Sequence, residues 1–406
     1  MRKHTTGDQE LVRKLNTAVI LDCLRFSSSL SRADLSHRTS LNRSTVSSII
    51  SELIDEGLVR ETELQKDKLG RPGMSLELDP NGGAAVGIEI GVDFISVLLT
   101  DFVAKPYWRK RIQVDPASGQ PALLAMAEAL IQEALQYAEA CHAHLLGIGV
   151  GVPGLIDVQR GTIVVAPNLN WHDIPLRQMW TQLFNLPVFV ENDANAAALG
   201  EYYFGVAREV KNFIYLSADV GLGGGIVLDG KLFRGHSGYA GEVGHMTIEP
   251  NGLPCSCGRR GCWETLVGLR GIVHQIQVML QNGATSLIRD LVQGDLNNIT
   301  FEQVVAAAEA GDAIALNALY NVAKWLGIGI ANLVNVFNPE MVVLGGGLAC
   351  GSKLWEPVLG ATVHEFAWKQ SLETLQLTTS AHGTEACVVG TVALVLDDIL
   401  RYPALS

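Results

Sequence analysis

The stretch at residues 241–264, GEVGHMTIEPNGLPCSCGRRGCWE, places one histidine and three cysteines within 18 residues. Three thiolates and one imidazole make the closed tetrahedral set of a structural zinc site. Reduced, buried cysteines are the alternative, and a catalytic zinc is disfavoured because protein side chains fill all four positions. The spacing therefore predicts a structural Zn²⁺ held by His245, Cys255, Cys257 and Cys262.

On both sides of this stretch, apolar strands, glycine turns and helices alternate. Residues 84–102 read as two strands around a glycine turn, residues 186–205 as a strand, a polar turn and a helix, and residues 340–349 as a strand running into a glycine loop. Repeated strand–glycine–helix units indicate α/β layers. Two such lobes with a cleft between them fit the chain length.

The N-terminal segment has a different pattern. Helical spacing of apolar residues is followed by two possible helix N-caps, Ser31 and Asn42, and then by two extended runs at 58–64 and 74–79. A polar, basic, glycine-bearing tip separates these two runs. This order of three helices and a hairpin predicts a winged helix-turn-helix, although a helical protein-interaction module would have similar helices.

Charge separates the two parts. The 406 residues carry a net charge of −12, but residues 1–73 hold 12 Lys+Arg and 10 Asp+Glu, a balance of +2. The remainder has 18 against 32, a balance of −14. A basic head on an acidic body favours separate modules, of which the head meets phosphate.

The rest of the composition indicates a soluble, cytoplasmic protein. No uninterrupted apolar run reaches about 18 residues, which predicts no membrane span, and the start lacks an apolar signal region. The seven cysteines are an odd number, which disfavours a disulfide framework.

Four blocks together resemble the ROK family of repressors and sugar kinases. They are the stretch at 241–264, VPGLID at 152–157, APNLNW at 166–171 and ENDANAAALGE at 191–201. The residues of these blocks are most similar to those of the xylose-repressor branch. The resemblance implies a winged helix-turn-helix at 1–80 and a two-lobed, actin/hexokinase-like (ribonuclease H-like) α/β domain. Its lobes would span 81–200 and 201–406, with the C-terminal helix returning to the first lobe.

The resemblance also implies a monosaccharide pocket, whose carboxylates and amides can pair with sugar hydroxyls through strong, charge-assisted hydrogen bonds. The implied ligand residues are Asn168, Asn192, Asp193, Glu242, His245 and Glu264. His245 would bind zinc with one ring nitrogen and face the sugar with the other. Asp193 could instead cap a helix, Asn168 could be a turn residue, and Glu242 could be a surface acid.

In the family's kinases the residue that matches Asp193 is the general base that deprotonates the sugar hydroxyl, which then attacks the γ-phosphate of ATP. Here Val92 and Asp93 replace residues that approach phosphate after the first strand, and Asp219 and Val220 do so in the second glycine loop. Two acids near the phosphate path oppose ATP. We therefore expect the kinase chemistry to be lost, with Asp193 catalytic only if it survives.

The N-terminal module is then expected to bind DNA. The segment from Asn42 would be the recognition helix, and an arginine in the wing tip would suit a narrow minor groove. The predicted contacts are Asn42, Arg43, Ser44, Thr45, Ser47 and Arg71. Lys66 and Lys68 could neutralise phosphates.

These features together predict a sugar-responsive repressor. A homodimer, or a dimer of dimers, would hold two operator half-sites, and xylose or glucose bound between the lobes would lower operator affinity. The alternatives are a sugar kinase that carries a DNA-binding head and a repressor controlled by a protein partner.

Overall fold

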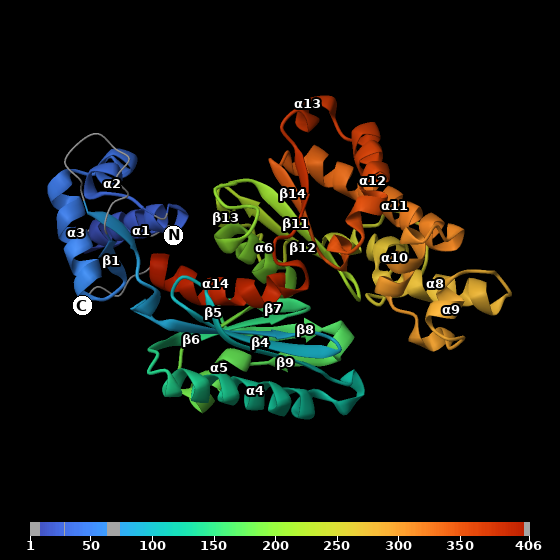
Figure 1. Ribbon diagram of the computed structural model, residues 1–406, viewed down its shortest axis with the longest axis horizontal. Helices are drawn as coiled ribbons and strands as arrows, with labels where there is room; N and C mark the ends of the chain where they lie inside the picture. The colour runs from blue at the N-terminus through green and yellow to red at the C-terminus, as the bar shows by residue number, and fades with distance from the viewer. Residues whose placement is uncertain (1–8, 28, 63–73, 402–406) are drawn as a thin grey trace. The chain divides into compact units, whose positions relative to one another are not determined.

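The computed structural model describes residues 9–27, 29–62 and 74–401. In the N-terminal head, three helices precede a two-stranded antiparallel hairpin (Figure 1): α1 (Gln9–Phe26), α2 (Arg32–Thr39), α3 (Arg43–Asp55), β1 (Val59–Thr62) and β2 (Ser75–Leu78). Ser31 caps α2 in a capping box with Asp34, and Asn42 caps α3 by accepting from the Thr45 amide. The predicted helices, caps and hairpin are therefore confirmed.

The head has its own apolar core. One face of α3 presents Val46, Ile49, Ile50 and Leu53, all fully buried. Helix α2 contacts both α3 and α1, and α1 and α2 bury further apolar residues, among them Ile20, Leu21 and Leu35. Because α3 uses its apolar face for this core, its other face, which includes Arg43, Ser44 and Ser47, stays exposed.

The chain forms two compact units. Unit 1 comprises residues 1–150, 176–190 and 391–406, and unit 2 comprises residues 151–175 and 191–390. The division differs from the boundaries inferred from sequence, because residues 151–175 and 191–200 group with unit 2. The last helix, α14 (Ala386–Arg401), begins in unit 2 and ends in unit 1.

The sheet that runs through unit 1 has the strand order β10-β6-β3-β4-β5. Its strands are β3 (Ala84–Ile90), β4 (Phe94–Asp101), β5 (Pro106–Gln113), β6 (Leu145–Val152) and β10 (Val188–Asn192). Strands β3, β4 and β5 form an antiparallel meander, and α4 (Gln120–Ala140) lies along them. Helix α5 (Leu176–Phe184) precedes β10.

Unit 2 repeats this arrangement. Its five-stranded sheet has the order β13-β12-β11-β14-β15, with β11–β12–β13 antiparallel and β11–β14–β15 parallel. In both sheets the first strand in sequence is central, its hairpin partners lie on one side, and the later strands lie on the other. The strands are β11 (Phe213–Ala218), β12 (Leu222–Leu228), β13 (Lys231–Leu232), β14 (Met341–Gly346) and β15 (Gln376–Thr379).

Helices and a smaller sheet complete unit 2 (Figure 1). The antiparallel strands β7 (Leu155–Asp157), β8 (Thr162–Ala166) and β9 (Trp171–Ile174) follow β6. The longer helices are α6 (Asp193–Phe204), α8 (Leu269–Gln281), α10 (Phe301–Glu309), α11 (Ala313–Phe337) and α12 (Ser352–Phe366), and the short ones include α7 (Glu264–Val267), α9 (Ile288–Leu291) and α13 (Lys369–Leu372).

Helix α11 is long and apolar enough to cross a membrane by length and composition. The sequence, by contrast, predicts no membrane span. Helix α11 packs against α12, α10, α8 and α7, and its residues Leu326, Ile330 and Val334 are fully buried in the core of unit 2. The apolar character of α11 is therefore explained by its place in that core.

Candidate ligand and metal site

The six residues implied as sugar ligands all belong to unit 2. Asn192 ends β10, Asp193 begins α6, and Glu264 begins α7. Glu242 and His245 lie at the two ends of a tight 3-10 turn. Asn168 lies in a second 3-10 turn and is exposed.

The start of α6 is capped by Asn192 rather than by Asp193. The Asn192 Oδ1 atom accepts hydrogen bonds from the amides of Ala194 (3.0 Å) and Asn195 (3.1 Å), and its Nδ2 donates to the Gly154 carbonyl (3.1 Å). Asp193 accepts a further bond from the Ala194 amide at 2.8 Å. Since Asn192 already performs the capping, capping alone does not account for an aspartate at position 193.

The glycines of β12 allow α6 and the loop at 241–245 to approach closely. A Cβ atom at Gly223 would lie 2.9 Å from the Ala194 Cβ, and one at Gly225 would lie 2.6 Å from the Ala194 carbonyl oxygen. A Cβ atom at Gly224 would lie 2.6 Å from Val243. These glycines, which the sequence suggested as a phosphate loop, therefore also bring the segments of Asp193 and Glu242 together.

The carboxylates of this cluster are electrostatically coupled. Burial raises the pKa of Asp193, against the hydrogen bonds from Ala194 and Asn192. Glu242 keeps 41% of its side chain exposed, yet burial of the remainder raises its pKa, and the charges of Asp193 and Glu264 add to the rise while His245 opposes it. Neighbouring acids with raised pKa values are typical of a ligand-binding site.

The predicted metal ligands converge. One donor atom from each of His245, Cys255, Cys257 and Cys262 lies within 4.8 Å of all the others. The Cys257 and Cys262 sulfurs are 3.7 Å apart, and the Cys255 sulfur is 3.6 Å from the His245 Nδ1. A tetrahedral ion with metal–sulfur bonds of about 2.3 Å separates its sulfurs by about 3.8 Å. The cluster therefore has the chemistry and spacing to hold a metal ion.

Two of the cysteine thiols are shifted in opposite directions. Burial raises the pKa of Cys255, and its hydrogen bond to the Glu264 carboxylate raises it further. Burial also acts to raise the pKa of Cys257, but hydrogen bonds from Arg259 and the two other cysteines outweigh it and lower the pKa to about 6. Thiolates are the metal-binding form, so Cys257 is already suited to a metal.

His245 and Glu264 connect the metal cluster to the acids. The His245 Nδ1 faces the cysteines, and its Nε2 lies 3.9 Å from the Glu242 carboxylate. The Glu264 Oε1 accepts from the Cys255 thiol at 2.7 Å and lies 3.4 Å from the His245 Nδ1. The ring is therefore placed with one nitrogen toward the metal ligands and the other toward an acid.

The segments that match phosphate loops in kinases are covered by other groups of this chain. In unit 1 the Phe94 ring lies where a Cβ atom of Gly91 would be, and the Arg111 guanidinium stacks 3.6 Å above that ring. In unit 2 the Asp219 Oδ1 accepts from the Gly347 amide at 3.1 Å. That amide belongs to the run of three glycines at 345–347, which matches a further glycine loop of the kinases, so the carboxylate uses a donor that a phosphate would need.

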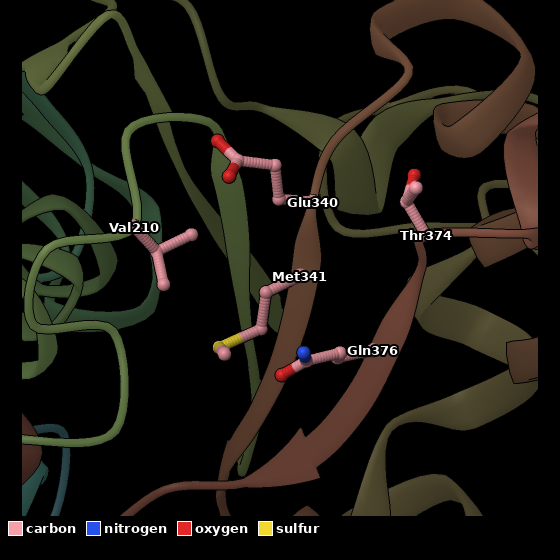
Figure 2. A pocket seen from close by; sticks show the side chains of 5 residues that line it. All are labelled: Val210, Glu340, Met341, Thr374 and Gln376. Atoms are coloured by element: carbon pink, nitrogen blue, oxygen red, sulfur yellow. The ribbon is translucent and has the colours of Figure 1, made fainter.

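A pocket of about 260 Å³ lies at a different place in unit 2 (Figure 2). Its side chains come from the N-terminal ends of β14 and β15 and from the segment before β11: Val210, Glu340, Met341, Thr374 and Gln376. The Asp219 contact, by contrast, is at the C-terminal ends of β11 and β14. Ligands of α/β sheets bind at the carboxyl ends, so this pocket is not the candidate site.

In the head, the predicted DNA-contacting residues lie at the first two turns of α3. Arg43, Ser44 and Ser47 are exposed, and Thr45 is partly exposed. The Asn42 side chain is occupied by capping, since it also accepts from the Ser44 hydroxyl at 2.7 Å. The wing tip with Arg71, Lys66 and Lys68 lies outside the described residues.

Two residues of the site were not predicted. Glu191, at the end of β10, is 1% exposed and is paired with Arg234, which follows β13. A glutamate beside the Asn-Asp pair and an arginine in a glycine-rich loop were the available signals, but their pairing spans 43 residues of sequence and is visible only in the fold.

The comparisons with known proteins agree with this architecture. The ROK family matches residues 85–398, and the IclR helix-turn-helix domain matches residues 15–63. The xylose repressor of Caldicellulosiruptor bescii is 36% identical over 397 residues, which cover 98% of this chain and 99% of that protein. The glucokinase of Halalkalibacterium halodurans is 34% identical over 303 residues, 74% of this chain and 88% of that enzyme.

Among solved structures, a ROK family transcriptional regulator described as a homologue of E. coli MLC superposes with a TM-score of 0.82. It is 29% identical, and the match covers 96% of this chain and 98% of that one. The chain therefore belongs to the ROK family. Its helix-turn-helix head and full-length match set it beside the family's transcriptional regulators, whereas the glucokinase aligns with only part of the chain.

Proposed function

We propose that this chain is a sugar-responsive, DNA-binding repressor of carbohydrate genes, with xylose or glucose as its effector. The observation that carries the proposal is one chain holding a helix-turn-helix with an exposed α3 face and a coupled acidic cluster beside a Cys₃His site. The full-length similarity to a xylose repressor supports xylose as the first candidate.

The acidic cluster suits a sugar. Each hydroxyl both donates and accepts, so the carboxylates of Asp193, Glu242 and Glu264 accept from it while the Asn168 and Asn192 amides and the His245 ring complete the set. Hydroxyl donors also relieve the repulsion between the acids. Binding between the two units, with their closure on the sugar, stays a prediction.

The metal in this proposal is a structural Zn²⁺. Three thiolates with one imidazole are a typical set for zinc, and a bound ion would supply a rigid tetrahedral anchor for the loop at 241–264. His245 and Glu264 would then be fixed in place as part of that loop.

At the operator, the exposed side chains of Arg43, Ser44 and Ser47 and the partly exposed Thr45 reach bases and phosphates in the major groove. Asn42 sets the start of the helix. A homodimer, or a dimer of dimers, presents two heads to two half-sites. Acting on chromosomal operators places the protein in the cytoplasm. Sugar and operator then oppose each other's binding by the same factor.

A sugar kinase with a DNA-binding head is the second candidate, because Asp193 stands where the family's kinases have their base and a ROK glucokinase aligns with 74% of the chain. The Asp219–Gly347 contact and the Phe94 ring over Gly91 argue against a bound nucleotide. Asp193 would be catalytic only in this second candidate.

Calorimetric titration of the zinc-loaded protein with xylose, glucose and ATP–Mg²⁺, each separately, tests the choice. Sugar binding without ATP binding is the expected result, and ADP release with a sugar would establish the kinase instead. Operator binding should weaken in the presence of the bound sugar. Equal operator affinity with and without xylose and glucose contradicts induction, and points to control by a protein partner.

For DNA, Arg43→Ala should weaken operator binding by about 10-fold, which is within the range for one base or phosphate contact. Arg160→Ala, a highly exposed arginine of unit 2, is the matched control and should leave operator affinity unchanged.

A further inference from the structure

The Glu191 carboxylate is buried, accepts three hydrogen bonds and forms an ion pair with Arg234. Its Oε2 accepts a hydrogen bond from the Arg234 Nε at 2.8 Å, and the Arg234 Nη2 lies 2.6 Å from the same oxygen in an ion pair. Its Oε1 accepts from the Asn192 amide at 3.0 Å and the Asn195 Nδ2 at 3.2 Å. A carboxylate that is 1% exposed is stable only with such partners, so these contacts hold one another in place.

Each partner of this carboxylate belongs to a segment of the candidate site. Asn192 caps α6, directly before Asp193, and its side chain also reaches the Gly154 carbonyl in the 152–157 block. The Arg234 carbonyl accepts from the Ala240 amide at 3.0 Å, which closes the turn that leads into Glu242. The buried carboxylate thus connects the start of α6 to the segment of Arg234, and Asn192 connects that start to the 152–157 block.

The cluster needs such a restraint. The charges of Asp193 and Glu264 both act on Glu242, so without a ligand the repulsion on Glu242 favours separation of its segment from theirs. The metal ligands hold the loop only from His245 onward, whereas Arg234 holds it on the other side of Glu242. The two attachments bracket Glu242.

We propose that Glu191 and Arg234 are a positioning pair for the effector, setting Glu242 against Asp193 without touching the sugar. The inference rests on the proposed sugar function. It makes this ion pair a determinant of effector affinity and selectivity, because the pair fixes the spacing between groups that bind different hydroxyls.

The experiment measures sugar affinity, the ratio of xylose to glucose affinities, sugar-free operator affinity and metal content in the full-length, metal-loaded protein. Arg234→Lys keeps the charge but loses the two-pronged contact, and should lower sugar affinity about 10-fold and change the selectivity ratio at least threefold. Sugar-free operator affinity and metal content should stay within twofold. Arg160→Lys, on an exposed pair with Asp157 in the same unit, is the control.

A double-mutant cycle with Glu191→Gln and Arg234→Met separates the pair from its members. The double variant should lose no more sugar affinity than the worse single variant, since either change breaks the same contact. Additive losses would overturn the proposal. So would an Arg234→Lys protein that loses sugar and operator affinity equally, because that pattern indicates a general structural role.

The proposed function fails in a different way. If Asp193→Ala binds sugar as the unmodified protein does, the ligand site itself is wrongly assigned. If Asp193→Ala abolishes binding while Arg234→Lys and Arg234→Met leave affinity and selectivity unchanged, only the positioning pair is refuted. Should Arg234→Met fail to fold, Arg234→Lys still decides the question.

Discussion

Two regions of unit 2 both combine acids with glycines, yet they differ in how the acids are satisfied. At the ends of β11 and β14, the Asp219 carboxylate accepts from the Gly347 amide and so uses the chain's own donor. In the cluster around Glu242, burial raises the pKa of Glu242, and the charges of Asp193 and Glu264 add to that rise. The first region is complete without a ligand, whereas the second is electrostatically strained. The comparison teaches that a ligand is expected where several acids lie close enough for their charges to act on one of them.

Removing the metal should have the largest effect on sugar binding by the cluster around Glu242. Cys262→Ser, or dialysis against a chelator, frees the loop that carries His245 and Glu264, and sugar affinity should fall about 100-fold or more. Metal analysis and calorimetry measure the two losses together. Cys350→Ser, outside the cluster, is the control and should change neither. Full sugar affinity in a metal-free protein would show that the acids need no such support.

Asp193→Ala should reduce sugar affinity by about 100-fold, the cost of two charge-assisted hydrogen bonds to hydroxyls. Asn192 still caps α6 in this variant, so the fold should persist and the circular dichroism spectrum should match the parent. Glu249→Ala, an exposed acid of the metal-bearing segment, provides the comparison. Equal losses for the two variants would mean a general charge effect.

At the ends of β11 and β14, Asp219→Gly combined with Val220→Thr should free the Gly347 amide as a hydrogen-bond donor. The variant should then bind ATP–Mg²⁺ with a Kd of about 1 mM, a binding free energy of roughly 4 kcal/mol in magnitude. Asp219→Asn, which removes the charge but retains an acceptor for the Gly347 amide, is the control and should not bind. Binding of ATP–Mg²⁺ by the unmodified protein would contradict the view that Asp219 closes this loop.

The smallest effect concerns the pH dependence of stability. Burial raises the pKa of Asp193, so the folded state holds this proton more tightly than the unfolded chain. The contribution to stability is present below the ordinary aspartate pKa and is lost as pH rises through the raised value. Asp193→Asn should therefore raise the Tm of the ligand-free protein by ~2 °C at pH 7 and not at all at low pH.

Thermal unfolding at several pH values checks this sign. Glu249→Gln, for which the side chain is exposed, serves as the matched neutralisation and should leave Tm unchanged at every pH. A Tm that falls at pH 7 in Asp193→Asn would mean that the folded protein stabilises the charged carboxylate. That result would contradict the view that the acids around Glu242 are unfavourable without a ligand.

Local chemistry made much of this protein predictable. Ser31 and Asn42 are N-caps because their side chains satisfy amides within three residues. The cysteine spacing predicted the metal cluster because residues 255–262 are too close in sequence to separate. The four blocks that resemble the ROK family predicted the fold. Each of these signals depends on neighbours along the chain.

What the sequence by itself determined is therefore the set of modules, the capped helices and the chemical types at the site. Only the tertiary structure decided which groups meet. Glu191 pairs with Arg234 across 43 residues, and Asp219 reaches Gly347 across 128. Such contacts depend on strand order and on glycines that let backbones approach. No local pattern encodes them, because their free energy arises only when the elements that carry the two partners have assembled.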